Sequence, residues 1–599
     1  MGRSKKRSRA SKARLNPLNN ANGTSAKDAN LITKKIQPLL TQLQSAVPNE
    51  RSMAISSISV LCEDPHMRQL LLKQKLIHII LTHSLNDDNK DVVIESYGLL
   101  RNLTLEEGYD VSIYLWRNDI WVAIKEGFKQ VVSSLQSMYS PAADSKMDKK
   151  QIANHNQAKT LLFDYADNLI SLLVSLTNNS DDILNEILND ENLPIVFDLI
   201  ANFQQYGFKN LTTALQNTIL DLIYDFSSES LDFIDALIKQ DAVISLIDSL
   251  RKDAPVNELT QVLLQGILMQ VLEADENATL HATECIEFIQ SITKAIQPIN
   301  LQQMNSDLNL VIKDEVDIPK LKEQAKKRQL AMMQMQALEI GLDLLAGIIE
   351  MVSSLDVDVS ENLSTVLLSI IPPVLDALLE QFADRVFIVW NNMLWLFIGA
   401  DENVDEAVLR KVWNDVAKCN DNDITSIKMS KVSVMWVILK ICGNQGNIAL
   451  LTEFNVWNNA SFSQTVIEQY QAVAEMEFKQ RCCALLATVA SYQTQNTEIN
   501  QLVGNFFLEQ LVSKDTPVEI LVEITSALFE LYSDSEFTYD LPVFVNGGYL
   551  AILQDKVLPN LRNVFKMVDK NKDPALKEKC NDTFNTLQSF IQYKATERS

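Results

Sequence analysis

Glycine and proline are scarce in this chain of 599 residues, which contains 15 of each. Average usage would give roughly 42 glycines and roughly 30 prolines in a chain of this length. Sandwich, barrel and βαβ folds need many tight turns, and these two residues form such turns. Their scarcity therefore excludes these fold classes. Because 47% of the residues are apolar, the main part of the chain can bury a core and is predicted to be all-helical.

Cysteine and histidine are also few, and neither forms a pattern of metal ligands. The seven cysteines are scattered and include no Cys-x-x-Cys pair, and none of the five histidines lies beyond residue 281. The sequence has no phosphate-binding glycine loop, no G-x-S-x-G and no H-E-x-x-H. We therefore predict a protein that is not an enzyme, holds no metal or cofactor, and keeps its thiols reduced and buried.

The chain lacks a run of 18 or more apolar residues, and its N-terminus is too basic for a secretory signal. We therefore predict a soluble intracellular protein without membrane contact. Residues 1–19 carry seven cations and no acid, so the formal charge of −24 leaves −31 on the remaining residues. An acidic body repels nucleic acid phosphates and attracts basic proteins.

A repeat is visible along the chain. Asn102, near the end of an amphipathic helical pattern, is followed sixteen residues later by a polar turn and a new helical pattern at Asn118. Asp225 is likewise sixteen residues before Asp241 and Glu530 sixteen before Asn546, whereas Ser175 is seventeen before Asn192. An earlier copy continues at Lys75. The new helical patterns near 75, 119, 192 and 241 are 44, 73 and 49 residues apart. Two of these intervals approach the armadillo or HEAT unit of roughly 40–47 residues. We predict an all-α armadillo/HEAT-repeat solenoid.

The predicted layout has four parts. Residues 1–30 form a disordered basic tail, and residues 31–295 form armadillo-like repeats with a polar, helix-poor insertion at about 135–160. Residues 296–335 are a central insert, and residues 336–599 form HEAT-like repeats. Helices in this last part are predicted around 338–352, 361–380, 385–398, 404–418, 428–442, 464–492, 499–513 and 517–533.

Asparagine and tryptophan on the inner helices of armadillo-type solenoids grip extended peptides, because an asparagine amide can both donate to and accept from a peptide backbone. The candidate cargo groove comprises Asn102, Asp225, Asn391, Asn392, Trp395 and Glu530. Serine or an acid replaces asparagine at several analogous positions, so the series is incomplete. The acids would suit a basic peptide, and ordinary helix packing is the alternative explanation.

Two further segments carry charge that could recognise a partner. The central insert begins with a candidate acidic site of Asp307, Asp314, Glu315 and Asp317, followed by a basic stretch. In the tail, Arg14-Leu15-Asn16-Pro17-Leu18 resembles the proline-leucine variant of a nuclear localisation signal that is read by transportin. The candidate carrier-binding residues are Arg3, Lys5, Lys6, Arg7, Arg9, Arg14, Pro17 and Leu18. A generic basic signal and an RNA-binding arm are the alternatives.

The basic start from Met1 to Arg7, the proline-leucine signal, the armadillo-like repeats, the acidic insert and the HEAT-like repeats together resemble the symportin family of fungal import adaptors. That resemblance implies a chaperone for two basic large-subunit ribosomal proteins, numbers five and eleven, which escort 5S ribosomal RNA. It implies that one cargo enters the groove, that the other lies near the acidic insert, and that transportin takes the tail. The RNA would be an indirect partner of a monomeric protein that shuttles between cytoplasm and nucleus.

The central insert departs from the family pattern, because it holds only four acids before it turns basic. This departure leaves the second cargo site in doubt. A generic armadillo/HEAT scaffold and an importin-alpha-like cargo receptor are the alternative functions.

Overall fold

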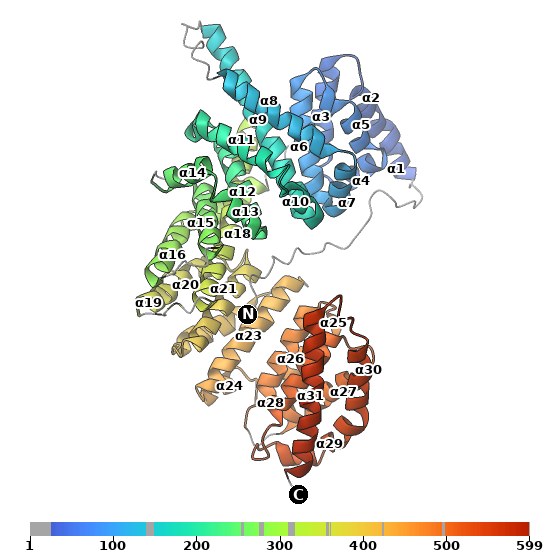
Figure 1. Cartoon of the computed structure of the whole chain (residues 1–599), viewed down its shortest axis with the longest axis vertical. Helices are drawn as coiled ribbons and strands as arrows, with labels where there is room; N and C mark the ends of the chain where they lie inside the picture. The colour runs from blue at the N-terminus through green and yellow to red at the C-terminus, as the bar shows by residue number, and fades with distance from the viewer. Residues whose placement is uncertain are drawn as a thin grey trace. The chain divides into compact units, whose positions relative to one another are not determined.

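The computed structural model describes residues 26–138, 149–252, 257–274, 281–309, 318–354, 357, 359, 361–421, 424–493 and 497–597. Every regular element in these ranges is a helix, so the predicted all-helical repeat fold is confirmed. The chain divides into two compact units (Figure 1). Unit 1 comprises Met1–Thr279 and Pro298–Ala337, and unit 2 comprises Leu280–Gln297 and Leu338–Ser599.

Unit 1 contains three short helical turns, η1 (Ile32–Ile36), η2 (Ser84–Asn86) and η4 (Phe208–Asn210), and a series of α-helices. These are α1 (Ala26–Leu31), α2 (Gln37–Gln42), α3 (Pro48–Leu61), α4 (Pro65–Lys73), α5 (Leu76–Thr82), α6 (Lys90–Glu107), α7 (Tyr109–Arg117), α8 (Ile120–Met138), α9 (Lys149–Asn179), α10 (Asp181–Ile187), α11 (Leu193–Tyr206), α12 (Thr213–Glu229), α13 (Leu231–Leu237), α14 (Asp241–Lys252), α15 (Glu258–Ala274) and α17 (Leu301–Leu308).

The helix α18 (Ile318–Ser354) contributes to both units. Unit 2 contains the turns η5 (Asp540–Val545) and η6 (Leu553–Val557). Its other helices are α16 (Ala282–Ile296), α19 (Glu361–Ser369), α20 (Ile371–Leu378), α21 (Ala383–Gly399), α22 (Glu406–Lys418), α23 (Thr425–Asn444), α24 (Ile448–Glu453), α25 (Ser461–Ala472), α26 (Met476–Ala490), α27 (Glu498–Val512), α28 (Val518–Leu531), α29 (Tyr549–Ile552), α30 (Leu558–Lys566) and α31 (Pro574–Thr596).

Short polar residues and the few prolines define where these helices begin. The side chains of Asp64, Ser180 and Thr212 accept hydrogen bonds from the first-turn amides of α4, α10 and α12. Such caps satisfy amides that have no partner within the helix. Proline occupies the first turn of α3, α4, α11, α20, α30 and α31, where its missing N–H costs nothing.

The helix starts inferred from the repeat agree with the structure. The predicted turns precede α5, α8, α11, α14 and α29. Three of these helices follow a residue with a left-handed backbone, namely Lys75 (φ 63°), Asp119 (φ 60°) and Gly548 (φ 67°). The polar turns in the sequence therefore mark the sharp bends at which each of these helices begins.

Several predicted boundaries need correction. The insertion at about 135–160 is not helix-poor as a whole, because α8 continues to Met138 and α9 begins at Lys149. The boundary at 335 falls inside α18, which continues unbroken to Ser354. The helix predicted at 464–492 is two helices, and the one at 361–380 divides at Ile370, ahead of two prolines. The tail of residues 1–25 lies outside the described residues.

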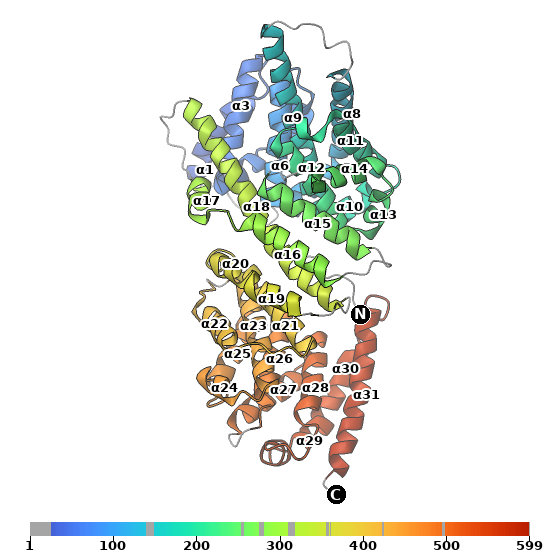
Figure 2. The same cartoon turned by 90° about the vertical axis from the view of Figure 1, so that its left-hand side faces the viewer.

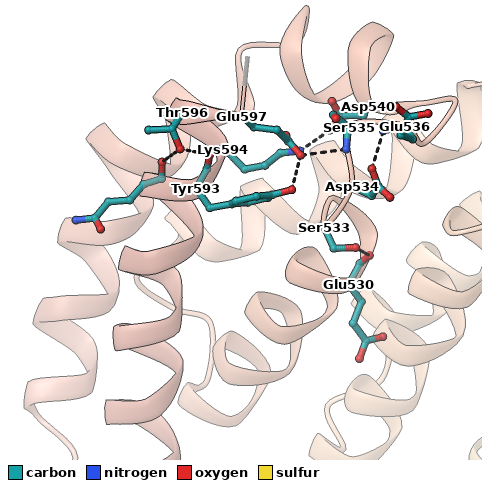
Figure 3. A network of polar contacts seen from close by, with 11 residues as sticks. Glu530, Ser533, Asp534, Ser535, Glu536, Asp540, Tyr593, Lys594, Thr596 and Glu597 are labelled. Carbon is teal, nitrogen blue, oxygen red and sulfur yellow. Dashed lines mark hydrogen bonds and ion pairs between the residues drawn. The ribbon is translucent and has the colours of Figure 1, made fainter. Parts of the chain in front are cut away.

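A buried ion pair holds the last turn of α31 in unit 2 (Figure 3). Lys594 Nζ lies 2.9 Å from Asp540 Oδ1 at the start of η5 and 2.6 Å from Glu597 Oε2. The side chains of Lys594 and Asp540 are 1% and 0% exposed. Lys594 also lies 5.1 Å from the centre of the Phe544 ring, and the Tyr593 hydroxyl donates to Glu597. This network fixes the end of α31 against η5.

Candidate functional site

Each unit contains a row of long helices that pack side by side. Row 1, in unit 1, consists of α3, α6, α9, α12 and α15, and row 2, in unit 2, consists of α21, α23, α26, α28 and α31. The candidate groove residues fall into two sets. Asn102 and Asp225 lie on row 1, whereas Asn391, Asn392, Trp395 and Glu530 lie on row 2.

Row 1 is acidic. Its five helices carry twelve carboxylates and six cations. The acids gather in residues 91–107 of α6, 160–178 of α9 and 213–229 of α12, which hold nine carboxylates and one cation, Arg101. Two of the nine, Glu106 and Glu107, pair with Arg68 of α4. Row 2 is mixed, with Lys431 and Arg481 on two of its helices and Glu523 on a third. The two rows therefore differ in the ligands that they suit.

Hydrogen bonds link the carboxylates of neighbouring row 1 helices. The Ser56 hydroxyl of α3 donates to Glu95 Oε2 of α6 at 2.6 Å. The Thr218 hydroxyl of α12 donates to Asp167 Oδ1 of α9, also at 2.6 Å. A carboxylate has about four acceptor positions, so one such bond leaves capacity for a ligand.

Arg101 is placed between α6 and α9 by close helix packing. Its Nη1 lies 3.2 Å from Asn168 Oδ1 and 3.9 Å from Asp167 Oδ2. Asn168 in turn donates to the Ile94 carbonyl at 3.1 Å. A Cβ on Gly98 would come within 3.2 Å of the Asn168 side chain, so glycine permits this approach. Arg101, the one cation of these three stretches, therefore interacts with side chains of α9.

Burial and mutual repulsion shift the titration of the row 1 acids. Burial raises the pKa of Glu95 and Asp91 adds to the rise, against the opposing hydrogen bond from Ser56. Burial also raises the pKa of Asp164, with a further contribution from Asp167. The pKa of Asp167 is raised by burial despite Thr218 and Arg101. Negative charge here is undercompensated, so lysine or arginine from a ligand would be favoured.

The two predicted row 1 residues differ in accessibility. Asn102 is exposed, and its Oδ1 accepts from the Arg101 guanidinium at 3.0 and 3.1 Å. Asp225 is 9% exposed and accepts a hydrogen bond from the Asn178 amide of α9. Asn102 therefore offers a free surface to a ligand, whereas Asp225 also joins α9 to α12.

An aromatic pair marks row 2. The rings of Trp395 on α21 and Trp436 on α23 meet edge to face, with centroids 5.0 Å apart. Both side chains are half-buried, and Trp436 Nε1 donates to the Thr488 hydroxyl of α26 at 3.0 Å. The pair presents an apolar surface across α21 and α23, which suits the side chains of an extended segment.

The asparagines before Trp395 are partly engaged. Asn392 Nδ2 donates to the Ala346 carbonyl at 3.3 Å, and its Oδ1 accepts from Asn391 Nδ2 at 3.1 Å. Asn391 Oδ1 is buried and has no hydrogen-bond donor within the described structure. A buried acceptor without a donor costs about 1–3 kcal/mol. Asn391, four residues before Trp395 and on the same helix face, therefore favours a donor supplied by a ligand.

Glu530 is exposed on α28, seven residues or about two turns beyond the half-buried Glu523. Burial raises the pKa of Glu523, and repulsion from Glu530 adds to the rise. The two carboxylates form a local acidic spot on a row of otherwise mixed charge. Its distance along row 2 from Trp395 spans several helices, so Glu530 belongs to a different part of the surface.

The remaining candidate residues are only partly described. Asp307 lies on α17 of unit 1, where its Oδ2 accepts from Gln303 Nε2 at 3.0 Å. Asp314, Glu315 and Asp317 lie outside the described residues. The candidate carrier-binding residues of the tail, between Arg3 and Leu18, also lie outside them.

The described residues hold no cluster of three or more histidine, cysteine, aspartate or glutamate side chains that could bind a metal. Burial raises the pKa of Cys62, Cys442 and Cys482 to about 12, so these thiols are protonated at neutral pH. In the same ranges no helix combines the length and apolarity needed to cross a membrane.

Sequence reasoning missed Glu95, Asp164, Asp167 and Asp221 on row 1, and Trp436 on row 2. A signal existed for part of this set. Asp164 and Asp167 are three residues apart, and Asp221 and Asp225 are four apart, so each pair shares one helix face. Glu95 likewise lies four residues after Asp91 on one face of α6. Trp436 has no comparable spacing, and only the packing of neighbouring helices brings it to the site.

Known proteins resemble this chain along its length. The family model described as SYO1-like, TPR repeats matches residues 376–598. Synchronized import protein 1 of Saccharomyces cerevisiae is 44% identical over 625 aligned residues, which cover 100% of both chains. The alignment therefore includes both units and the tail.

Two more distant relatives extend the comparison. The armadillo repeat protein involved in nucleocytoplasmic transport Syo2, of Schizosaccharomyces pombe, is 22% identical with 100% of both chains covered. Symportin 1 of Chaetomium thermophilum is 22% identical, with 94% of this chain and 95% of its own covered. On the strength of the full-length match at 44% identity, this chain belongs to the SYO1-like, or symportin, family.

Proposed function

We propose that this protein is a non-enzymatic nuclear import adaptor and chaperone for two basic proteins of the large ribosomal subunit, numbers five and eleven. It links them to a transportin-type carrier and shuttles between cytoplasm and nucleus. Full-length similarity to Synchronized import protein 1 supports the general role. The observation that carries the cargo assignment is the acidic surface of row 1.

Row 1 suits a basic cargo segment. Nine carboxylates and one arginine occupy the stretches given above on α6, α9 and α12, and burial raises the pKa of Glu95, Asp164 and Asp167. A lysine or arginine that binds here would offset the repulsion among the row 1 carboxylates, because its positive charge attracts them at a partly desolvated site. Such complementarity increases both specificity and association rate. Ribosomal proteins are basic, so they match this surface.

Row 2 suits an extended segment with an apolar side chain. The Trp395–Trp436 pair supplies a contact surface, and Asn391 Oδ1 supplies an acceptor for a backbone amide. Two surfaces of different chemistry, one in each unit, support an adaptor that holds two cargoes. The tail signal that ends in Pro17-Leu18 would remain available to the carrier.

Copurification tests the proposal. The tagged full-length protein is isolated from cells in low and high salt beside the variant Pro17→Ala/Leu18→Ala, and the bound proteins are identified. We expect ribosomal proteins five and eleven and transportin with the parent protein, and loss of transportin alone with the variant. High salt should weaken the row 1 cargo most, because salt screens charge.

Leu15→Ala/Asn16→Ala is the matched control, since it changes the same stretch of tail between the positions that define the signal. This control should keep the carrier. Absence of both ribosomal proteins from the parent sample would overturn the cargo assignment. Equal loss of transportin in both variants would overturn the proline-leucine assignment and leave a general basic signal.

A further inference from the structure

The first half of α18, residues 318–337, lies against row 1 of unit 1. Arg328 Nη1 is 3.5 Å from Glu63 Oε2, just beyond the end of α3. Eight residues later, Gln336 Nε2 donates to Asp221 Oδ1 of α12 at 2.9 Å. Ala331, between them, is 2% exposed. In Figure 2 this half of α18 crosses in front of helices of row 1.

The helix meets row 1 where its carboxylates gather. Thr218, Asp221 and Asp225 lie at spacings of three and four residues, on one face of α12. Thr218 bonds to Asp167, Asp221 bonds to Gln336 of α18, and Asp225 bonds to Asn178. The first half of α18 therefore occupies the same helix face as the proposed cargo surface.

This half of α18 also has the charge of a cargo segment. Residues 318–337 contain five cations and one carboxylate. The exposed Lys326 and Lys327 stand beside Arg328, and Lys327 pairs with Glu323 of its own helix at 2.9 Å. A basic helix on an acidic surface satisfies the same electrostatic requirement as a basic ligand.

The two polar contacts given above differ in burial, because the Gln336–Asp221 hydrogen bond is half-buried whereas the Arg328–Glu63 pair is exposed. Arg328 and Glu63 are 45% and 57% exposed, and ion pairs of this kind contribute little. Gln324 Oε1 is buried without a hydrogen-bond donor. The second half of α18 differs, because Leu338, Leu342 and Leu345 are buried in the core of unit 2. One half of the helix is anchored, and the other half is weakly docked.

We propose that the first half of α18 is an intramolecular competitor for row 1: it covers the acidic surface in the free protein and is displaced by a basic cargo segment. The inference rests on the proposed function of row 1 as a cargo surface. Docking of α18 would weaken the apparent affinity for cargo by the fraction of molecules in which row 1 is open. The docked helix would also exclude weakly basic ligands. When the first half of α18 binds row 1 again, it would favour release of the cargo.

The test compares two double variants of the full-length protein. Arg328→Ala/Gln336→Ala removes both row 1 contacts. Lys327→Ala/Gln329→Ala is the control, since it also removes one cation and one glutamine from the same half-helix, but Lys327 pairs with Glu323 of its own helix and Gln329 is exposed. Binding of a fluorescent peptide of alternating lysine and glycine is measured by anisotropy. Hydrogen exchange of the amides of residues 318–337 is followed with and without the peptide.

We expect the first variant to bind the peptide about threefold to tenfold more tightly than the parent, the range for losing one exposed ion pair and one hydrogen bond. The control should bind like the parent. In the parent, the peptide should accelerate exchange in residues 318–337, and in the first variant exchange should already be fast.

Two outcomes overturn the proposal and are distinguishable. Peptide binding of equal strength in all three proteins, without a change in exchange, would show that α18 does not compete, and row 1 would remain a cargo surface. Failure of the peptide to bind any of the three would overturn the cargo role of row 1 and the proposal with it.

Discussion

At the residue scale, Glu95 of row 1 illustrates a charge that opposes folding. Burial raises its pKa and Asp91 adds to the rise, although the Ser56 hydroxyl counteracts both. A raised pKa means that the folded state disfavours the ionised form. The stability contributed by this group is full below its unfolded pKa of about 4.3 and is lost as the pH rises through the higher folded pKa.

The variant Glu95→Gln should therefore stabilise the protein at pH 7 by a few tenths of a kcal/mol, discounted for partial exposure. The gain should vanish below the unfolded pKa of about 4.3, where the parent is protonated. Urea unfolding midpoints at acidic and neutral pH measure both effects. The same variant should bind the lysine–glycine peptide more weakly, since it removes a charge from row 1.

Glu191→Gln provides the control, because Glu191 is exposed on the loop before α11. It should change neither the unfolding midpoint nor peptide binding. Destabilisation by Glu95→Gln at neutral pH would contradict the argument. It would mean that the hydrogen bond from Ser56 outweighs burial and repulsion.

Lys594 is the opposite case, a buried charge that stabilises. Its ammonium lies between Asp540 and Glu597, and neither Lys594 nor Asp540 is measurably accessible. Lys594→Met would leave two carboxylates without their cation, and breaking a buried pair in this way costs about 3–5 kcal/mol. Urea unfolding measures the loss, and Lys570→Met, on an exposed loop, should be neutral. A cost of about 1 kcal/mol or less, the value for a surface pair, would contradict the role of Lys594.

The pH dependence of this network also has a definite sign. Burial alone would raise the pKa of Glu597, but hydrogen bonds from Lys594 and Tyr593 outweigh burial and lower it. A lowered pKa contributes stability that is present above the unfolded pKa of about 4.3 and lost as the pH falls through the folded pKa. Acid should therefore weaken the contribution of Glu597 to the free energy of unfolding. Lys594→Met should abolish the part of the loss of stability in acid that comes from Glu597.

At the element scale, substitution of a residue with a left-handed backbone tests whether that backbone conformation defines the start of the next helix. Gly548 has φ 67° before α29, and a Cβ there would meet no atom within 4 Å. Gly548→Ala should thus destabilise by about 1–2 kcal/mol through backbone strain alone. The matched control is Gly399→Ala at the end of α21, where a Cβ also meets nothing.

Gly399→Ala should be neutral or stabilise by about 0.4–1 kcal/mol, because alanine restricts the unfolded chain and suits a helix. Thermal or urea unfolding of both variants makes the comparison. Equal effects of the two substitutions would mean that the bend before α29 relaxes easily, and the φ of Gly548 would then not define the start of that helix.

The helix starts were predictable because polar turns with left-handed residues leave a local signal. Asn118-Asp119 before α8 and Gly547-Gly548 before α29 are such turns. The break between α25 and α26 at 473–475 carries neither glycine nor proline, so local chemistry does not reveal it. The continuity of α18 through 335 was missed for a related reason. Its change from basic to apolar residues does lie close to the unit boundary at Ala337/Leu338, but that boundary falls within an unbroken helix.

The site was predictable only in part. Asn102, Asp225 and Trp395 were identified from their place near helix ends or beside asparagine, and they do lie on the two rows. The placement of Glu95 beside Ser56 depends on how α3 and α6 pack, thirty-nine residues apart. Such contacts between neighbouring helices leave no trace in the spacing of one chain.

At the scale of the whole molecule, the order of the chain does not follow the order of the units. The segment Leu280–Gln297, with α16, belongs to unit 2, and the chain then returns to unit 1 for Pro298–Ala337. Helix α16 packs on α19 and α20, and its Ile289, Ile292 and Ile296 are buried. The boundaries predicted at 295/296 and 335/336 lie within two residues of the unit boundaries at 297/298 and 337/338, but the sequence did not reveal that Leu280–Gln297 belongs to unit 2.

The exchange of segments predicts how fragments behave. The fragment 318–599 retains all of α18 but lacks α16, whereas 281–599 retains both. Loss of α16 removes three buried isoleucines from unit 2, two of which, Ile292 and Ile296, lie against Gly341 of α18, at about 1.5–3 kcal/mol for each buried side chain. The free energy of unfolding of the shorter fragment should therefore be lower by several kcal/mol, which lowers its urea midpoint, and this fragment should bind a hydrophobic dye.

The longer fragment should unfold in one cooperative transition at a midpoint near that of unit 2 in the full chain. Equal midpoints for the two fragments would mean that α16 contributes nothing to unit 2, and that the sequence boundary at 335 is the physical one. A lower midpoint for 318–599 would place α16 in the core of unit 2. The first half of α18 would then be the last segment of the chain that belongs to unit 1, and all later residues would belong to unit 2.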